Sequence, residues 1–280
     1  MSRLYTFGCS FTSYAWPTWA DFFGLEFDEF ENWGIPGIGN VAIANRVAEC
    51  CLKNNINEND TVVVQWSSHL RNDYHLFRPP LNRDTDFNWK TKGSIFSYTN
   101  KSLYDKKWVE NFFDEESYIM LSLNAMYSII NLLENKKCKW RMTTISDFSK
   151  LGNDYINSEN FGEDSNLSNL WNKEIFSPYK KIFNHKNWLE PIGTYCWKQK
   201  ELLYKWKEWQ DPHPSPGLCI DWLYNILKPS LNLDNTKLKP EQTKWYYKCQ
   251  EIKDNVDNLQ MYGDILYKEL ENFDKTYRGY

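Results

Sequence analysis

The chain has 280 residues, enough to bury a sizeable core as one enlarged domain or as one domain with a small appendage. Charged residues make up 25% of it and the formal net charge at pH 7 is only −4, so nothing indicates a surface for a polyanion and nucleic acid is not an expected partner. No run approaches the roughly 18 apolar residues of a membrane-spanning helix, so no membrane association is expected.

The first predicted element is a strand at residues 3–7, rich in Leu, Tyr, Thr and Phe and ended by Gly8. Ser10 follows two residues later. Open α/β sheets bind ligands outside the carboxyl ends of their strands, so a serine at this point is a candidate functional residue. The alternative is that residues 8–13 form a plain turn, in which Ser10 only caps a neighbouring group.

Two helices and a second buried strand follow. WPTWADFFGL predicts a short helix that ends at Gly24. After a brief strand or loop in EFDEFENWGIPGIGN, apolar residues at helical spacing predict a helix that has Asn40 as its N-cap. Residues 61–66 form a valine-rich run that is typical of strands buried in parallel sheets. This alternation predicts an α/β fold with a mostly parallel sheet.

The middle of the chain contains two polar segments with little periodicity. Residues 71–115 resemble an insertion over the edge of the sheet, and residues 147–172, rich in Asn, Ser, Asp and Gly, predict a long surface loop. The periodic elements predicted around them are a helix at 117–133, a strand at 139–145, and helical segments around 195–209 and 218–227.

The C-terminal part becomes charged and helical soon after residue 229. We therefore expect a main domain at 1–228 and a helical appendage at 229–280 that packs back on it. The appendage helices could also mediate self-association into an oligomer.

Cysteine usage and the N-terminus indicate the compartment. The seven cysteines, an odd number without a close C-x-x-C pair, predict reduced thiols and no zinc site. The N-terminus lacks the basic and apolar regions of a secretion signal, so a cytoplasmic protein is expected, unless export occurs as part of a particle or by another route. Aromatic residues make up 17% of the chain and either line a sugar or acyl groove or reflect compositional bias and core filling.

The stretch WQDPHPSPGLCIDWLYNIL contains one of the four histidines in an unusual setting. Ser215 and Pro216 are an N-cap and first-turn signature, so His213 lies in a loop just before a helix, with a proline on each side. Asp211 stands two residues away. Its carboxylate could hold one ring nitrogen of His213 and leave the other free for a serine hydroxyl.

Other candidates have weaker patterns. Cys9 could be a nucleophile, but its side chain points differently from that of the neighbouring serine. His69, Asp73 and His75 have the spacing of metal ligands but lack a second cluster, so a solvated loop is expected there. His185 is expected on the surface.

Four sequence blocks in this order are similar to those of the SGNH (GDSL-type) hydrolases: FGCSFT, NWGIPGIGN, a hydrophobic strand ending in QWSS, and DPHPSPG. The first block is most similar to GCSFT variants common in bacteria and their phages. The resemblance covers residues 1–228 apart from the two polar segments. It implies a three-layer α/β/α (flavodoxin-like) domain. If the chain comes from a phage, the resemblance also implies that the protein could associate with the virion.

The resemblance implies a role for each matching residue. Ser10 matches the nucleophile, His213 the general base, and Asp211 the acid that orients it. Gly37 matches an oxyanion donor through its backbone N–H, beside the N–H of Ser10 itself. Glycine suits that position because a close backbone approach to a tetrahedral oxyanion leaves no room for a side chain.

The chain departs from the family pattern at two of the positions to which the resemblance assigns roles. The third block usually supplies an Asn side chain as an oxyanion donor, whereas this strand is followed by Ser67, Ser68 and His69. Ser68 or His69 could replace that donor, or Asn72 could swing in. The spacing of Asp211 and His213 is Asp-x-His, where the family more often has Asp-x-x-His.

The resemblance implies a serine esterase that removes short acyl groups, such as acetyl, from a carbohydrate or another small ester, with no metal or organic cofactor. Two alternatives stay open. The domain could be catalytically weak or inactive and bind a glycan or a partner protein, or it could transfer the acyl group to a hydroxyl acceptor in place of water.

Overall fold

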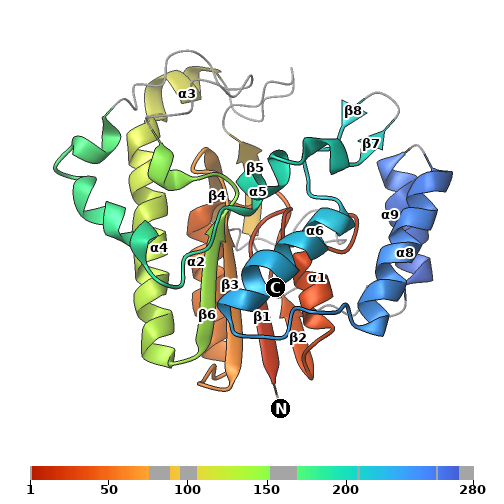
Figure 1. The fold of residues 1–280 in the computed structure, drawn as a ribbon. Helices are drawn as coiled ribbons and strands as arrows, with labels where there is room; N and C mark the ends of the chain where they lie inside the picture. The colour runs from red at the N-terminus through yellow and green to blue at the C-terminus, as the bar shows by residue number, and fades with distance from the viewer. Residues whose placement is uncertain are drawn as a thin grey trace.

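A four-stranded parallel β-sheet forms the centre of the computed structural model (Figure 1). The structure describes residues 2–75, 89–94, 106–151, 169–206, 209–256 and 258–270. Every neighbouring pair of strands in the sheet is parallel, which confirms the predicted α/β fold class. The strand order is β2 (Glu29–Asn32), β1 (Arg3–Phe7), β3 (Asp60–Trp66) and β6 (Lys139–Thr144).

All four strands end at the same edge of this sheet, because they are parallel. Phe7 in β1 is paired with Val64 in β3, so the residues that follow the two strands start from neighbouring positions. β3 is buried along its whole length, as expected from its valine-rich sequence. The loop containing Ser10 and the loop containing Ser67 therefore lie at the edge where α/β sheets bind ligands.

Helices flank the sheet. Figure 1 shows α6 (Pro216–Trp222) in front of it and α2 (Asn40–Lys53) behind it. α1 (Trp19–Gly24) contacts α6, and α4 (Glu115–Lys136) packs along α2. The N-terminus of α1 has a capping box, in which Thr18 and Asp21 satisfy each other's backbone N–H groups.

The start of α2 differs from the prediction by one residue. Gly39 is the N-cap, and Asn40 is the first residue of the helix. The Asn40 side chain does not cap the helix because its amide is bonded elsewhere: Oδ1 accepts from the N–H of Ser67, and Nδ2 donates to the carbonyl of Ser67 and to Oγ of Ser122. Asn40 thus ties α2 to the end of β3 and to α4.

The predicted helical segment at 195–209 is only partly helical. Its second half is an antiparallel pair of short strands, so the helix prediction is wrong there. The elements of this region are α5 (Ile192–Trp197), a 3₁₀ turn (Lys200–Leu202), β7 (Lys205–Trp206) and β8 (Trp209–Gln210).

Two aromatic side chains explain this difference. Tyr204 and Trp206 are buried, and both contact Trp16 and Tyr262, with ring centroids 5.1 to 6.2 Å apart. Residues two apart share a face on extended chain but not on a helix. Burying both rings in one cluster therefore favours the extended backbone over the helical one.

The first polar segment begins as a hairpin. β4 (Arg71–His75) and β5 (Trp89–Ser94) are antiparallel, and α3 (Lys106–Phe112) follows. The rest of the insertion predicted at 71–115 includes residues 76–88 and 95–105, which lie outside the described residues. Residues 152–168 of the second polar segment also lie outside them. In the described ends of that second segment, Lys150, Asn169 and Asn172 are exposed. The apolar side chains there are buried: Phe148, Leu151, Leu170 and Trp171. The short 3₁₀ helices nearby are Phe148–Lys150, Leu170–Asn172 and Ser177–Asn184.

The predicted C-terminal helices are present as α8 (Pro240–Asn255) and α9 (Leu259–Glu269), and α8 packs against α6. α6 itself continues through a π-helical turn (Leu223–Leu227) into α7 (Lys228–Ser230). The division of the chain into two domains at residue 228 stays a prediction. Among the described residues, no helix combines the length and apolarity needed to cross a membrane.

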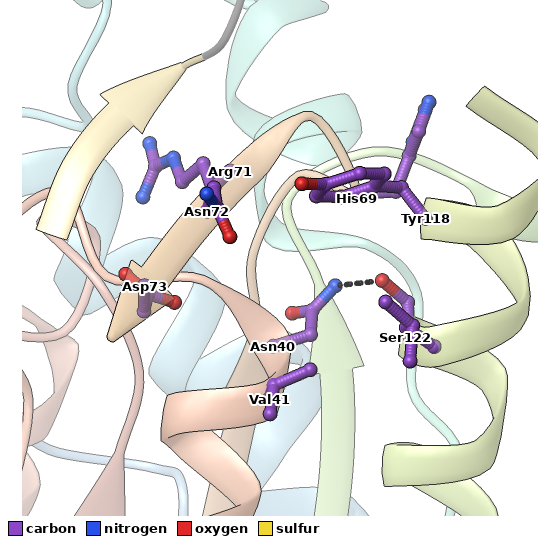
Figure 2. Close-up of a pocket in the computed structure, with 9 residues that line it drawn as sticks. Asn40, Val41, His69, Arg71, Asn72, Asp73, Tyr118 and Ser122 are labelled. Atoms are coloured by element: carbon purple, nitrogen blue, oxygen red, sulfur yellow. Dashed lines mark hydrogen bonds between the residues drawn. The ribbon is translucent and has the colours of Figure 1, made fainter. Parts of the chain in front are cut away.

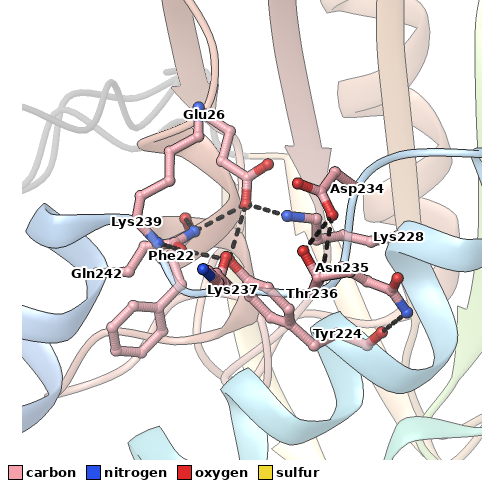
Figure 3. A network of polar contacts seen from close by, with 10 residues as sticks. All are labelled: Phe22, Glu26, Tyr224, Lys228, Asp234, Asn235, Thr236, Lys237, Lys239 and Gln242. Carbon is pink, nitrogen blue, oxygen red and sulfur yellow. Dashed lines mark hydrogen bonds and ion pairs between the residues drawn. The ribbon is translucent and has the colours of Figure 1, made fainter.

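A buried polar network joins α8 to α1 and α7 (Figure 3). Gln242 donates to the carbonyl of Phe22 and to Oε1 of Glu26, at 2.7 and 2.9 Å. The same Glu26 oxygen is 2.8 Å from Nζ of Lys228, and Tyr224 donates to Oε1 of Gln242. The side chains of Lys228 and Glu26 are only 3% and 11% exposed, so this ion pair is largely removed from water.

Replacing Lys228 by alanine is expected to lower the free energy of unfolding by about 3 to 5 kcal/mol, because the Glu26 carboxylate would be left buried without its cation. Urea unfolding measures the change. Lys244→Ala, which breaks the exposed pair with Glu241, is the matched control and should change stability little. Equal losses in the two variants would contradict this account of the network.

Candidate active site

Three polar side chains meet above the carboxyl ends of the strands. Oγ of Ser10 lies 2.8 Å from Nε2 of His213, and Nδ1 of His213 lies 2.6 Å from Oδ1 of Asp211. Ser10 follows β1, and the other two residues lie in the loop before α6. The structure therefore brings together the three residues that the sequence singled out from opposite ends of the chain.

The hydrogen-bond pattern defines which atoms carry protons. Burial alone would raise the pKa of the Asp211 carboxyl, but hydrogen bonds from the ring and backbone N–H of His213, the charge of His213 and a bond from Tyr14 outweigh burial and lower that pKa. Asp211 is therefore an ionised acceptor, and Nδ1 of His213 must be the donor to it. In the neutral imidazole the other ring nitrogen, Nε2, is then an acceptor for the hydroxyl proton of Ser10.

The turn that presents Ser10 is held by a buried glutamine of β3. Oε1 of Gln65 accepts from the backbone N–H and the thiol of Cys9 and from the hydroxyl of Thr12, at 3.1 to 3.4 Å. A Cβ on Gly8 would lie 2.7 Å from that same oxygen and 2.9 Å from the Gln65 carbonyl, so only glycine fits beside it. The thiol of Cys9, the alternative nucleophile, is fully buried and turned toward Gln65.

The loop that presents His213 is fixed at several points. Ser215 caps α6 by accepting from the N–H of Leu218, and Pro216 is in the first turn, as predicted. The indole N–H groups of Trp16 and Trp197 donate to the carbonyls of Pro214 and Pro212, at 2.9 and 3.1 Å. Each proline that flanks the histidine thus has its carbonyl bound by a tryptophan.

The second block forms a turn packed against the first. The N–H of Ile35 donates to the carbonyl of Gly8 at 3.0 Å, which joins this turn to the end of β1. Gly37 has a φ of 82°, a conformation that strongly favours glycine. On the far side, Asp73 accepts from the N–H of Gly39 at 2.7 Å. Gly37 thus lies in a turn anchored both to the Ser10 loop and to β4.

Two of the three candidates for the third oxyanion donor, Ser68 and His69, have other partners. Nε2 of His69 is 3.0 Å from Oε1 of Glu115, and Oγ of Ser68 accepts from the N–H of Leu70. An asparagine side chain does reach the end of β3, but it is that of Asn40 from α2, and both of its N–H donors are already used. The structure does not bring Ser68 or His69 into contact with Ser10.

A cavity of about 180 Å³, lined by both polar and apolar side chains, lies between α2, β4 and α4 (Figure 2). Its polar lining groups largely bind one another or the backbone: Asn40 to Ser122, Asp73 to the N–H of Gly39, and Arg71 to the carbonyl of Ile38. Figure 2 shows Asn40 pointing toward Ser122 at the base of the cavity. Within the described residues, no three His, Cys, Asp or Glu side chains are grouped to hold a metal ion.

Aromatic rings surround the histidine. Tyr14 stacks on the His213 ring with centroids 3.8 Å apart, and Phe11 lies 5.4 Å from it. Trp197 meets Phe11 edge to face at 6.2 Å and is 40% exposed, whereas Phe11 is buried. Trp197 therefore offers an accessible flat apolar surface at the rim of the Ser10 site.

Sequence reasoning missed two residues of this site, Tyr14 and Gln65. Tyr14 lies two residues after the block that contains Ser10 and contacts Asp211 across 197 positions of sequence. Gln65 is in the predicted third block, where a buried polar residue in a valine-rich strand is the signal that could have been noticed.

No family model and no curated protein matches the chain. One solved structure that it is similar to is a member of the lipolytic protein G-D-S-L family from Veillonella parvula DSM 2008. The two chains are 10% identical, and the match covers 91% of this chain and 100% of the other, with a TM-score of 0.38.

Proposed function

We propose that the protein is a serine esterase of the SGNH type that removes short acyl groups, acetyl above all, from a carbohydrate or another small ester. The observation that carries the proposal is the continuous hydrogen-bonded chain from Ser10 through His213 to Asp211. A serine turn without catalytic function has no need of a histidine at 2.8 Å that is itself oriented by a buried carboxylate.

In the proposed reaction, Oγ of Ser10 attacks the carbonyl carbon of the ester while Nε2 of His213 accepts the hydroxyl proton. The imidazolium that forms is stabilised by the carboxylate of Asp211 and returns the proton to the departing alcohol. Water then attacks the acyl-serine with the same base, which releases the carboxylic acid and restores the Ser10 hydroxyl.

The negative oxygen of each tetrahedral intermediate needs donors. We assign this role to the backbone N–H groups of Ser10 and Gly37, on the strength of the Gly37 turn and its bond to the first loop through Ile35. The partners of Ser68, His69 and Asn40 argue against a third, side-chain donor in this conformation. One missing donor lowers kcat by about 10² to 10³, so we expect a slow esterase.

Two other functions are favoured by specific features. The missing third donor favours a weak or inactive domain that binds a glycan or protein, and the acyl-serine chemistry is equally compatible with transfer to a hydroxyl acceptor. Incubation with 4-nitrophenyl acetate and with acetylated oligosaccharides, with and without an unacetylated sugar acceptor, tests all three. Acetate release supports hydrolysis, acetylated acceptor supports transfer, and neither product in any reaction would refute the esterase.

The substrate side of the proposal depends on Trp197. The indole is 40% exposed, yet its N–H is held by the carbonyl of Pro212, so the ring is an ordered platform near the nucleophile. A sugar ring has an apolar face that stacks on such a surface, whereas a small aliphatic ester is too short to reach it.

Trp197→Ala is accordingly expected to lower kcat/KM for an acetylated oligosaccharide about fivefold to tenfold, in line with the energy of one aromatic contact. The value for ethyl acetate should fall less, because for this substrate only the lost bond from the indole to the Pro212 carbonyl matters. Leu202→Ala, which removes another exposed apolar side chain of the same region, is the matched control and should change neither value. Equal loss on both substrates would refute a sugar platform at Trp197.

A further inference from the structure

The segment that supplies the nucleophile also binds the opposite loop at two further points. The Tyr14 hydroxyl donates to Oδ2 of Asp211 at 2.9 Å, and the indole of Trp16 donates to the carbonyl of Pro214. The Tyr14 ring lies 3.8 Å from the His213 ring at an angle of 21°. Tyr14 thus contacts two members of the Ser10 site with different parts of one side chain.

The two oxygens of the Asp211 carboxylate have different donors. Oδ1 accepts from the ring Nδ1 of His213 and from its backbone N–H, at 2.6 and 2.9 Å. Oδ2 accepts from Tyr14. The Asp211 side chain is fully buried, so water cannot readily replace a lost donor, and an ionised carboxylate that lacks a donor in such a place is costly.

We propose that Tyr14 is a positioning residue for the esterase reaction, which fixes the Asp211 carboxylate with its hydroxyl and the His213 ring with its aromatic face. This inference rests on the proposed function and extends it beyond the three residues of the family motif. Tyr14 acts through its two neighbours and has no contact with the serine oxygen in the described hydrogen bonds.

The hydroxyl of Tyr14 is a permanent donor. Burial raises the pKa of this phenol far above its usual range, and the charge of Asp211 and the hydrogen bond to it raise the pKa further. The charged group that meets the His213 ring within the described part of the chain is Asp211. Ser10 contributes a hydroxyl, and Tyr14 and Phe11 contribute aromatic rings.

The ring of Tyr14 is itself held in place. Trp16 meets it edge to face, with centroids 4.6 Å apart, and is fully buried. A stacked aromatic ring limits rotation of the imidazole about its side-chain bonds and stabilises the imidazolium that forms during catalysis. The ring and the hydroxyl therefore act on the same step by separate means, and separate substitutions can remove them.

Tyr14→Phe keeps the ring and removes the hydroxyl. We expect kcat/KM to fall about tenfold, equivalent to one hydrogen bond to a charged group. The acid limb of the pH–rate profile should also move to higher pH by about half a unit, because a carboxylate without the Tyr14 donor attracts the imidazole proton more strongly. Tyr14→Leu removes the ring as well, and its rate should fall about 100-fold.

Tyr195→Phe is the matched control, because the Tyr195 hydroxyl likewise donates to a carboxylate, that of Asp221 on α6. A purely structural loss would appear equally in both variants. NMR titration of the His213 imidazole gives a readout that does not need turnover. The His213→Asn variant shows which of the four histidine signals belongs to His213.

An upward shift of the titration midpoint in Tyr14→Phe and none in Tyr195→Phe supports the positioning role. Identical midpoints in the parent and Tyr14→Phe overturn it, whether or not the parent is an esterase. An inactive parent with a shifted midpoint refutes the proposed function and leaves the Tyr14 contact with the imidazole and carboxylate established.

Discussion

Replacing Ser10 by alanine is expected to reduce kcat for ester hydrolysis by about 10⁴ to 10⁶ while the free energy of unfolding stays nearly unchanged. The hydroxyl of Ser10 meets Nε2 of His213 and makes no other hydrogen bond described in the structure, so its loss removes the nucleophile and little packing. Steady-state kinetics and urea unfolding on the same preparation measure the two quantities.

Ser13→Ala is the matched control for this experiment. Ser13 lies in the same loop and is buried, and its Oγ has no hydrogen-bond partner among the described residues. The control should keep the parent kcat. Cys9→Ala tests the alternative nucleophile, and a loss of activity there with full activity in Ser10→Ala would contradict the assignment.

The second large effect is expected at Asp211. Asp211→Asn should lower kcat about 10⁴-fold, because the carboxamide NH₂ group can donate a hydrogen bond to Nδ1 of His213. Nδ1 would then be the acceptor and Nε2 would carry the proton, so the imidazole could not accept the hydroxyl proton of Ser10. Activity within about tenfold of the parent would show that Asp211 does not orient the base.

The same substitution changes the dependence of stability on pH. The pKa of Asp211 is lowered in the folded protein, so its carboxylate contributes stability that is present above the ordinary carboxyl pKa of 3.8 and is lost as pH falls through the lower folded value. Below about pH 4 the parent should therefore lose unfolding free energy more steeply than Asp211→Asn. Parallel curves between pH 2 and 6 would contradict the direction of the shift.

The sequence predicted those parts of the site that depend on local patterns. A glycine after a short strand predicts a turn and places Ser10 at the sheet edge, and the prolines around His213 predict a stiff loop before a helix. The spacing of Asp211 and His213 also proved sufficient, because Oδ1 of the aspartate reaches both the backbone N–H and the ring of the residue two positions later.

The parts that could not be predicted are contacts between distant segments. Gln65 holds the Cys9 turn from 56 positions away, and Tyr14 reaches Asp211 from 197 positions away. Asn40 has the residue type and spacing of a helix cap, and only the three-dimensional structure shows that its amide bonds to Ser67 instead. Local propensity cannot distinguish these uses of a polar side chain.

The aromatic content had two explanations, core filling and a sugar or acyl groove. The structure shows core filling directly, and the groove stays a proposal. Among the described residues, many of the large rings, including Trp16 and Trp222, are buried in the core. Trp197 is instead exposed beside the Ser10 site. The prediction of a helix through Trp206 failed for a related reason, because tertiary burial of two rings on one face outweighed the local helical pattern.

Activation of the Ser10 hydroxyl by His213 makes the serine reactive toward electrophiles, and this reactivity can be measured. The purified protein is treated with a fluorophosphonate, which reacts with activated serines, and the modified peptide is identified by mass spectrometry. We expect a single adduct on Ser10 that is absent in His213→Ala at the same pH. An unlabelled parent, or an adduct that forms equally in His213→Ala, would refute the activation of Ser10 by His213.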